Sequence, residues 1–142
     1  MSQDVYVISD LHLGGEPGFQ ICSPAGQALL ADFVRWVTAR HRSAAPAHLV
    51  LAGDVVDFLA ESPAAAFTAS ENEARDKLER IFSNTCAVWD ALAAHGAAGA
   101  PLTLMLGNHD IELALSSLPT FACVALDDGD RVRAADVYCF AA

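Results

Sequence analysis

Three segments of the sequence place side chains that bind metal ions or transfer protons directly after apolar runs. They are Asp10 and His12 after residues 5–8, Asp54 and Asp57 after residues 49–52, and Asn108, His109 and Asp110 after residues 102–106. Together they offer carboxylates, imidazoles and one amide. This mixture of oxygen and nitrogen ligands suits Mn, Fe or Zn.

The spacing within the segments favours a pair of ions that share one carboxylate. Asp10 and His12 are two residues apart, so in an extended segment both side chains can reach the same ion. Gly53 allows a sharp bend beside Asp54, whose two oxygens can bridge two ions. Asn108 adds a neutral oxygen donor, which limits the negative charge around the second ion.

Each segment also has a simpler interpretation when it is taken alone. Asp10 or Asp54 is typical of a turn or helix cap, because aspartate bonds to nearby backbone groups. The Asp-x-His pair by itself is a weak metal signal, and Gly-Asn-His-Asp could be a turn that enters an Asp-capped helix. The same arrangement after three successive apolar runs is much more specific than any one of them.

The apolar runs 5–8, 49–52 and 102–106 predict three buried strands of a parallel sheet covered on both faces. Between the first two, an apolar stripe with Ser23 and Pro24 before it predicts a helix from about residue 24. Between the second and third, helical spacing follows a capping box at Ser70 and Glu73, with a stop expected at Gly96 and a loop over 93–101.

The resulting β-α-β-α-β order predicts an α/β fold with right-handed crossovers. In such a sheet ligands bind beyond the carboxyl ends of the strands, so all three polar segments are expected at one edge. Further along, we expect a short helix over 111–118, strands over 121–126 and 137–140, and a turn over 127–130. The chain stops just after the last of these, which suggests one incomplete domain spanning residues 1–142.

The composition limits the classes of function. The formal net charge of −10 and the single lysine argue against an extended nucleic-acid-binding surface, although metal ions could still make an acidic site attract phosphate. Four scattered cysteines indicate free thiols rather than a zinc ribbon or a redox pair. Without an apparent signal peptide or membrane span, the chain is expected to be cytoplasmic.

The three motifs, Asp-x-His, Gly-Asp-x-x-Asp and Gly-Asn-His-Asp, resemble those of the calcineurin-like metallophosphoesterase superfamily. The resemblance implies the N-terminal βαβαβ half of that superfamily's α/β sandwich. It also implies that Asp10 and His12 bind one metal, that Asp54 bridges two, and that Asn108 binds the second. His109 would then contact the phosphate or protonate the leaving oxygen, while Asp57 orients it and Asp110 supports the loop.

The implied reaction is hydrolysis of a phosphomonoester, phosphodiester or anhydride by a metal-bridging hydroxide, without a covalent enzyme intermediate. Two divalent ions are expected, with Mn favoured over Fe or Zn. The opening Ser-Asp-Leu-His-Leu-Gly-Gly is similar to the bacterial branch that includes UDP-2,3-diacylglucosamine pyrophosphatases. A phosphate-containing small molecule or a nucleotide-lipid is therefore the expected substrate, and the oligomeric state is left open.

Two departures from the family pattern limit these expectations. The family continues with an isolated histidine and a Gly-His-x-His motif, but no histidine follows His109 in this sequence. The chain is therefore expected to be an N-terminal fragment or a degenerate, non-catalytic metal- or nucleotide-binding homologue. Phe58 stands where protein Ser/Thr phosphatases have arginine, which disfavours a phosphoprotein substrate. His41, His48 and His95 match no motif and are expected to be surface or loop residues.

Overall fold

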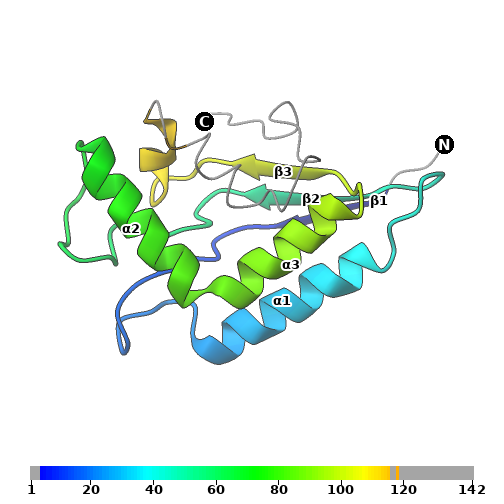
Figure 1. Cartoon of the computed structure of the whole chain (residues 1–142), viewed down its shortest axis with the longest axis horizontal. Coiled ribbons are helices and arrows are strands. Elements are labelled where there is room, and N and C mark those ends of the chain that lie inside the picture. Colours follow the sequence, from blue (N-terminus) through cyan, green and yellow to red (C-terminus); the bar gives the residue numbers. More distant parts are fainter. Residues whose placement is uncertain (1–3, 116–117, 119–142) are drawn as a thin grey trace.

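The computed structural model describes residues 4–115 and Leu118. Its elements are β1 (Asp4–Ile8), α1 (Pro24–Thr38), β2 (Ala47–Ala52), α2 (Glu71–Asn84), α3 (Cys86–Ala97), β3 (Leu102–Met105) and a 3-10 helix, η1 (Ile111–Ala114). The strands form a parallel sheet in the order β1-β2-β3. Figure 1 shows α1 and α3 side by side along the sheet, with α2 and η1 near the end where the strands finish. The predicted α/β class is confirmed.

The sheet is buried on the face that carries α1 and α3. The central strand β2 turns Ala47, Leu49 and Leu51 into the core, and each is at most 1% exposed. On the edge strand β1, Val5 and Val7 are 54% and 60% exposed. The prediction that every strand is fully buried is therefore wrong for β1, because alternate side chains of this strand point to the face that no described helix covers.

Both predicted helix starts are confirmed. The Ser23 hydroxyl accepts a hydrogen bond from the Gly26 N–H at 3.2 Å, directly before Pro24 opens α1. The Ser70 hydroxyl accepts one from the Glu73 N–H at 3.4 Å at the start of α2. Each cap satisfies a backbone donor that has no partner within the helix.

The long helical stretch between β2 and β3 is broken into α2 and α3 at Thr85. This residue leaves the helical region, with φ −126° and ψ 26°. Its buried hydroxyl donates to the Ile81 carbonyl at 2.6 Å and accepts from the Trp89 indole at 2.8 Å. Because the apolar spacing continues across the break, the sequence pattern did not reveal it.

The end of α3 also differs from the prediction. The helix continues through Gly96 to Ala97, and the turn comes at Gly99, whose φ is 76°. The helix ends one residue beyond the expected stop at Gly96, and the loop expected over 93–101 is confined to 98–101, since alanine favours the helix strongly enough to carry it further. Within the expected helix over 111–118, η1 covers four residues. The strands expected over 121–126 and 137–140, and the turn over 127–130, lie outside the described residues.

His95 is a core residue rather than a surface one, which corrects the expectation for this histidine. It is 0% exposed, its Nε2 donates to the Pro101 carbonyl at 3.2 Å, and its Nδ1 lies 3.0 Å from the Thr38 hydroxyl. These contacts tie α3 to α1 and to the start of β3. Burial is the main cause that lowers the pKa of His95.

Among the described helices, none has the length and apolar character to cross a membrane.

We expect His95 to make folding stability depend on pH. Because its pKa is lowered from 6.5 in the folded state, the unfolded chain binds more protons just below that pH, and stability falls as the pH decreases. His95→Gln should lower stability at neutral pH by about 1–3 kcal/mol but flatten this fall. Urea unfolding from about pH 7.5 to pH 5 measures both effects. An equal flattening in His48→Gln would contradict the assignment to His95.

Candidate metal centre and histidine pair

The segments that follow the three strands are hydrogen-bonded to one another. The Asp10 N–H donates to the Gly53 carbonyl at 3.1 Å, and the His12 N–H donates to the Asp54 carbonyl at 2.9 Å. From the third segment, the His109 N–H donates to the Asp54 carboxylate at 2.8 Å. The structure thus brings the three sequence motifs to one edge of the sheet.

Asp10, His12 and Asp54 form a group that fits a metal ion. One ligand atom from each lies within 4.8 Å of those of the other two. Asp10 is exposed, whereas His12 and Asp54 are partly buried. Two carboxylates and an imidazole form a donor set suited to Mn, Fe or Zn, so the residues present fit the ion that the sequence implies.

The backbone of this group is strained. Asp10, His12 and Asp54 have φ values of 56°, 47° and 52°, and they are the non-glycine residues with positive φ in the described part of the chain. Such a conformation costs of order 1 kcal/mol or more for each residue, and it persists only when neighbouring contacts impose it. The strain therefore falls on the three residues that could share a cation.

Two glycines let the second and third segments approach each other. Gly53 has a φ of 91°, which glycine adopts without penalty. A Cβ atom at Gly107 would overlap the Asp54 carboxylate and backbone nitrogen. The absence of a side chain at position 107 is what allows Asp54 to lie against the turn that carries Asn108 and His109.

Asp110 fixes this turn from the inside. Its carboxylate is 0% exposed, accepting the Gly107 N–H at 2.6 Å and the Val55 N–H at 2.7 Å. Burial raises the pKa of Asp110, while the two backbone N–H groups oppose that rise. One side chain thus joins the turn after β2 to the turn after β3, and Asn108 is exposed in the latter turn.

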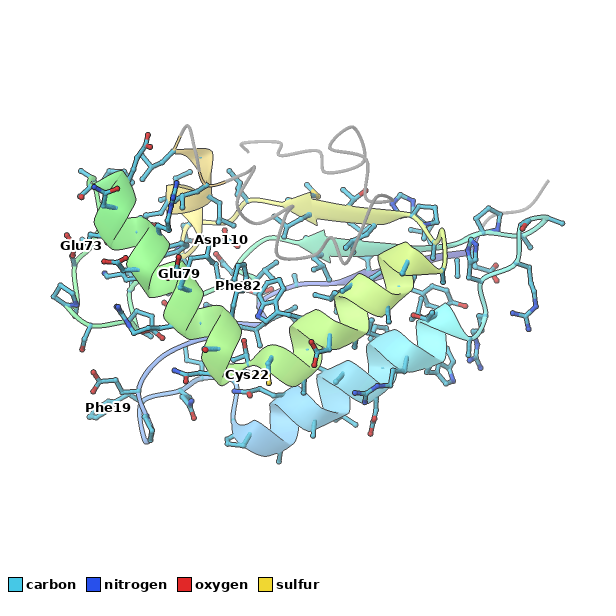
Figure 2. The ribbon with its side chains drawn as sticks, viewed as in Figure 1. Phe19, Cys22, Glu73, Glu79, Phe82 and Asp110 are labelled. Carbon is cyan, nitrogen blue, oxygen red and sulfur yellow. The ribbon has the colours of Figure 1, made fainter. Side chains whose placement is uncertain are left out.

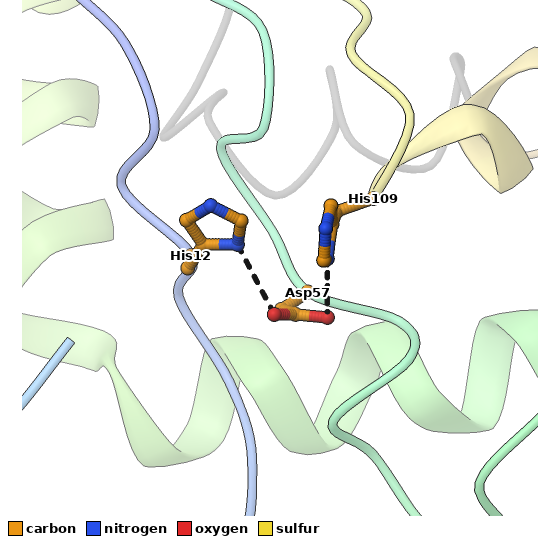
Figure 3. Close-up of side chains that lie close together, drawn as sticks. All are labelled: His12, Asp57 and His109. Carbon is orange, nitrogen blue, oxygen red and sulfur yellow. Dashed lines mark hydrogen bonds and ion pairs between the residues drawn. The ribbon is translucent and has the colours of Figure 1, made fainter. Parts of the chain in front are cut away.

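The Asp57 carboxylate is shared by two histidines (Figure 3). His12 Nδ1 lies 3.1 Å from one oxygen, and His109 Nδ1 lies 3.1 Å from the other. The rings meet edge to face, with centroids 4.5 Å apart. Since a carboxylate accepts from Nδ1–H, the Nε2 atom of each ring is left for another partner. The sequence assigned Asp57 to His109 but gave no sign of its contact with His12.

The pKa values of the pair follow from these contacts. Burial raises the pKa of Asp57, but the hydrogen bonds from His109, His12 and the Ala60 N–H outweigh it, and the net shift is downward. The bond to Asp57 is the main cause that raises the pKa of His109, against an opposing effect of burial. Asp57 is therefore held ionised beside an imidazole that retains its proton more readily than usual.

His12, Asp57 and His109 also have ligand atoms within 4.8 Å of one another. Hydrogen bonding explains this proximity without a metal ion. The Asp57 oxygen that contacts His109 also accepts the Leu59 and Ala60 N–H groups, each at 3.1 Å. Its acceptor capacity is already used, so the group of Asp10, His12 and Asp54 is the better cation site.

The chain matches a known protein family. The model of the family Metallophos, described as calcineurin-like phosphoesterase, matches residues 4–140. No curated protein and no solved structure matches the chain. The matched range contains all three strand-end motifs, and the structure describes most of it.

Gly107→Ala is expected to disrupt the cation site, because the added Cβ must displace Asp54. Titration calorimetry with Mn(II) should show affinity reduced by at least about tenfold, the scale of lost support around a metal site. Gly26→Ala in α1 is the matched control, since a Cβ there meets only ordinary contacts at 3.5 Å. Equal Mn(II) affinity in the two variants would show that Asp54 does not need this close approach.

Proposed function

Because this chain belongs to the calcineurin-like phosphoesterase family of metal-dependent phosphoester hydrolases, we propose that it hydrolyses a phosphate ester or anhydride at the edge of its sheet. One observation carries the proposal. The strained group of Asp10, His12 and Asp54 lies beside a histidine that Asp57 holds. Cation ligands and a proton donor at one sheet edge are the parts that phosphoester hydrolysis needs.

We assign Asp10, His12 and Asp54 by motif and by their proximity, and Asn108 by its motif alone. Asp10 and His12 would hold one divalent cation, Asp54 would bridge to a second, and Asn108 would contribute to the second. Mn is the favoured ion, with Fe or Zn as alternatives. When bound, such ions neutralise charge on the phosphate and lower the pKa of a nearby water molecule.

His109 is proposed as the acid that protonates the leaving oxygen. Its side chain is 28% exposed, so a substrate can reach it. The bond from Nδ1 to Asp57 fixes the ring and directs Nε2 away from the carboxylate. This bond also raises the pKa of His109, which keeps the ring protonated over more of the neutral range.

The proposed substrate is a phosphate-containing small molecule or a nucleotide-lipid, as in the bacterial branch that the opening motif resembles. Phe58, where Ser/Thr phosphatases have arginine, is 0% exposed. This position therefore offers a substrate neither a positive charge nor an accessible surface. A phosphoprotein, which presents a large surface around its phosphate, is the less suitable substrate class.

A second candidate function is metal or nucleotide binding without catalysis. It is favoured by the group of Asp10, His12 and Asp54, which could hold a cation whether or not hydrolysis follows. Fewer ligands would bind a cation more weakly, because affinity depends on ligand number and support. Binding of Mn(II) to the 142-residue chain without hydrolysis would select this function over the first.

Asp54→Asn tests the proposed hydrolase directly. The carboxylate that could bridge two cations becomes a neutral amide, so hydrolysis of bis-p-nitrophenyl phosphate with Mn(II) should fall by at least about 100-fold. Asp32→Asn is the matched control, because Asp32 lies exposed on α1 and pairs only with Arg35 there. Activity that survives Asp54→Asn would belong to another site or to a contaminant.

Asp57→Asn should lower kcat by about 10–100-fold, because the amide no longer orients His109 and His12 as a carboxylate does. His109→Gln should have an effect of similar size. If Asp57 acts on the leaving oxygen through His109, the double variant should be little worse than Asp57→Asn alone. Fully multiplicative losses would contradict the proposed pairing.

A further inference from the structure

Helix α2 carries Lys77, the only lysine of the chain, which is buried against the residue that follows Asp57. Lys77 is 0% exposed, and its ammonium donates to the Thr68 hydroxyl at 2.9 Å and to the Phe58 carbonyl at 3.3 Å. Removing an ammonium from water is costly unless hydrogen bonds or an opposite charge offset the loss. The two acceptors that offset it belong to the segment that directly follows Asp57.

The first of these contacts leads to His109. Phe58 accepts from Lys77 through its carbonyl, and its N–H donates to the His109 carbonyl at 3.1 Å. The Phe58 side chain is 0% exposed, so core packing holds the residue in addition to these two hydrogen bonds of its backbone. Lys77 thereby holds the backbone that carries Asp57 and that contacts His109.

The second hydrogen bond of Lys77, to Thr68, leads to the segment that follows His109 in the sequence. The Thr68 N–H donates to the Glu112 carboxylate at 2.8 Å, and Glu112 lies on η1, two residues after Asp110. Glu112 is 0% exposed, and its other oxygen has no hydrogen-bond partner among the described residues. Thr68 thus links Lys77 to a buried carboxylate, since it accepts from the one and donates to the other. Figure 1 shows α2 close to η1, and Figure 2 places Asp110 beside them.

We propose that Lys77 is a positioning residue for His109, which it holds through Phe58 on one side and through Thr68 and Glu112 on the other. This inference rests on the proposed hydrolase function. The hydrogen bonds of Lys77 go to Phe58 and Thr68, and neither goes to a candidate cation ligand or to the His109 ring. Phe58 contacts the His109 backbone directly, whereas His12 is reached only through Asp57, so the loss of Lys77 should lower kcat more than it weakens the binding of cations.

Arg80 offers a matched control for a merely structural role. It lies one turn further along α2 and also holds the segment after Asp57, through the Glu61 carboxylate and the Ser62 carbonyl. None of its hydrogen bonds goes to Phe58 or Thr68. A general loosening of this segment would appear in Arg80→Met, whereas the proposed effect on His109 would not.

The test compares Lys77→Met, Lys77→Met with Glu112→Gln, and Arg80→Met. The double variant removes both buried charges, which protects folding if the single change leaves Glu112 uncompensated. With Mn(II) and bis-p-nitrophenyl phosphate, kcat should fall by about 10–100-fold in the lysine variants, while KM and Mn(II) affinity stay within about threefold. Unchanged kcat in the folded double variant, or Mn(II) affinity falling in parallel with kcat, would overturn the inference.

Hydrogen exchange of metal-free protein separates this inference from the proposed function. The Phe58 amide should exchange about tenfold faster in the lysine variants than in the wild type, relative to the Leu49 amide in β2. Leu49 N–H donates to the Pro101 carbonyl and reports opening of the sheet. If the wild type does not hydrolyse the substrate, the proposed function is contradicted. The exchange rate of the Phe58 amide would still show whether Lys77 holds this backbone. Unchanged relative exchange would show that Lys77 does not hold this backbone.

Discussion

The close approach of the Asp54 carboxylate to the Gly107 backbone is the contact on which the site depends. It is possible because position 107 has no Cβ and because Gly53 turns the chain sharply after β2. Once Asp54 lies there, its carboxylate accepts the His109 N–H and still has a second oxygen available. A parallel sheet brings strand ends to the same edge, but it is this contact that brings them within ligand distance.

The site lowers the free energy of unfolding, and the surrounding hydrogen bonds explain why it forms nonetheless. Asp10 and Asp54 combine positive φ with negative charge, and the nearby Asp110 is buried, with backbone N–H groups donating to its carboxylate. Carboxylates this close repel one another and oppose folding. Backbone N–H groups of the adjoining turns offset part of this energy, and bound cations would offset more. An arrangement that a cation stabilises is an argument for binding, because packing alone would not select it.

Local and periodic features of the fold could be predicted from the sequence. The strand ends, the caps at Ser23 and Ser70 and the convergence of the motifs follow from short-range rules and the geometry of a parallel sheet. The break at Thr85, the burial of His95 and the burial of Lys77 could not be predicted. Each depends on partners from distant parts of the chain, such as Thr38 for His95, and periodicity does not reveal those partners.

The contact of Asp57 with both histidines was missed for the same reason, and it changes how the site can be understood. His12 belongs to the candidate cation ligands and His109 to the proposed proton-transfer step, yet both rings contact one carboxylate. The carboxylate is in turn fixed by the Leu59 and Ala60 N–H groups. Since neither ring can shift without disturbing Asp57, the separation between the candidate cation ligand and the proposed acid is set by the fold. That fixed separation is what a reaction requires when charge must be neutralised at one end of a phosphate and a proton delivered at the other.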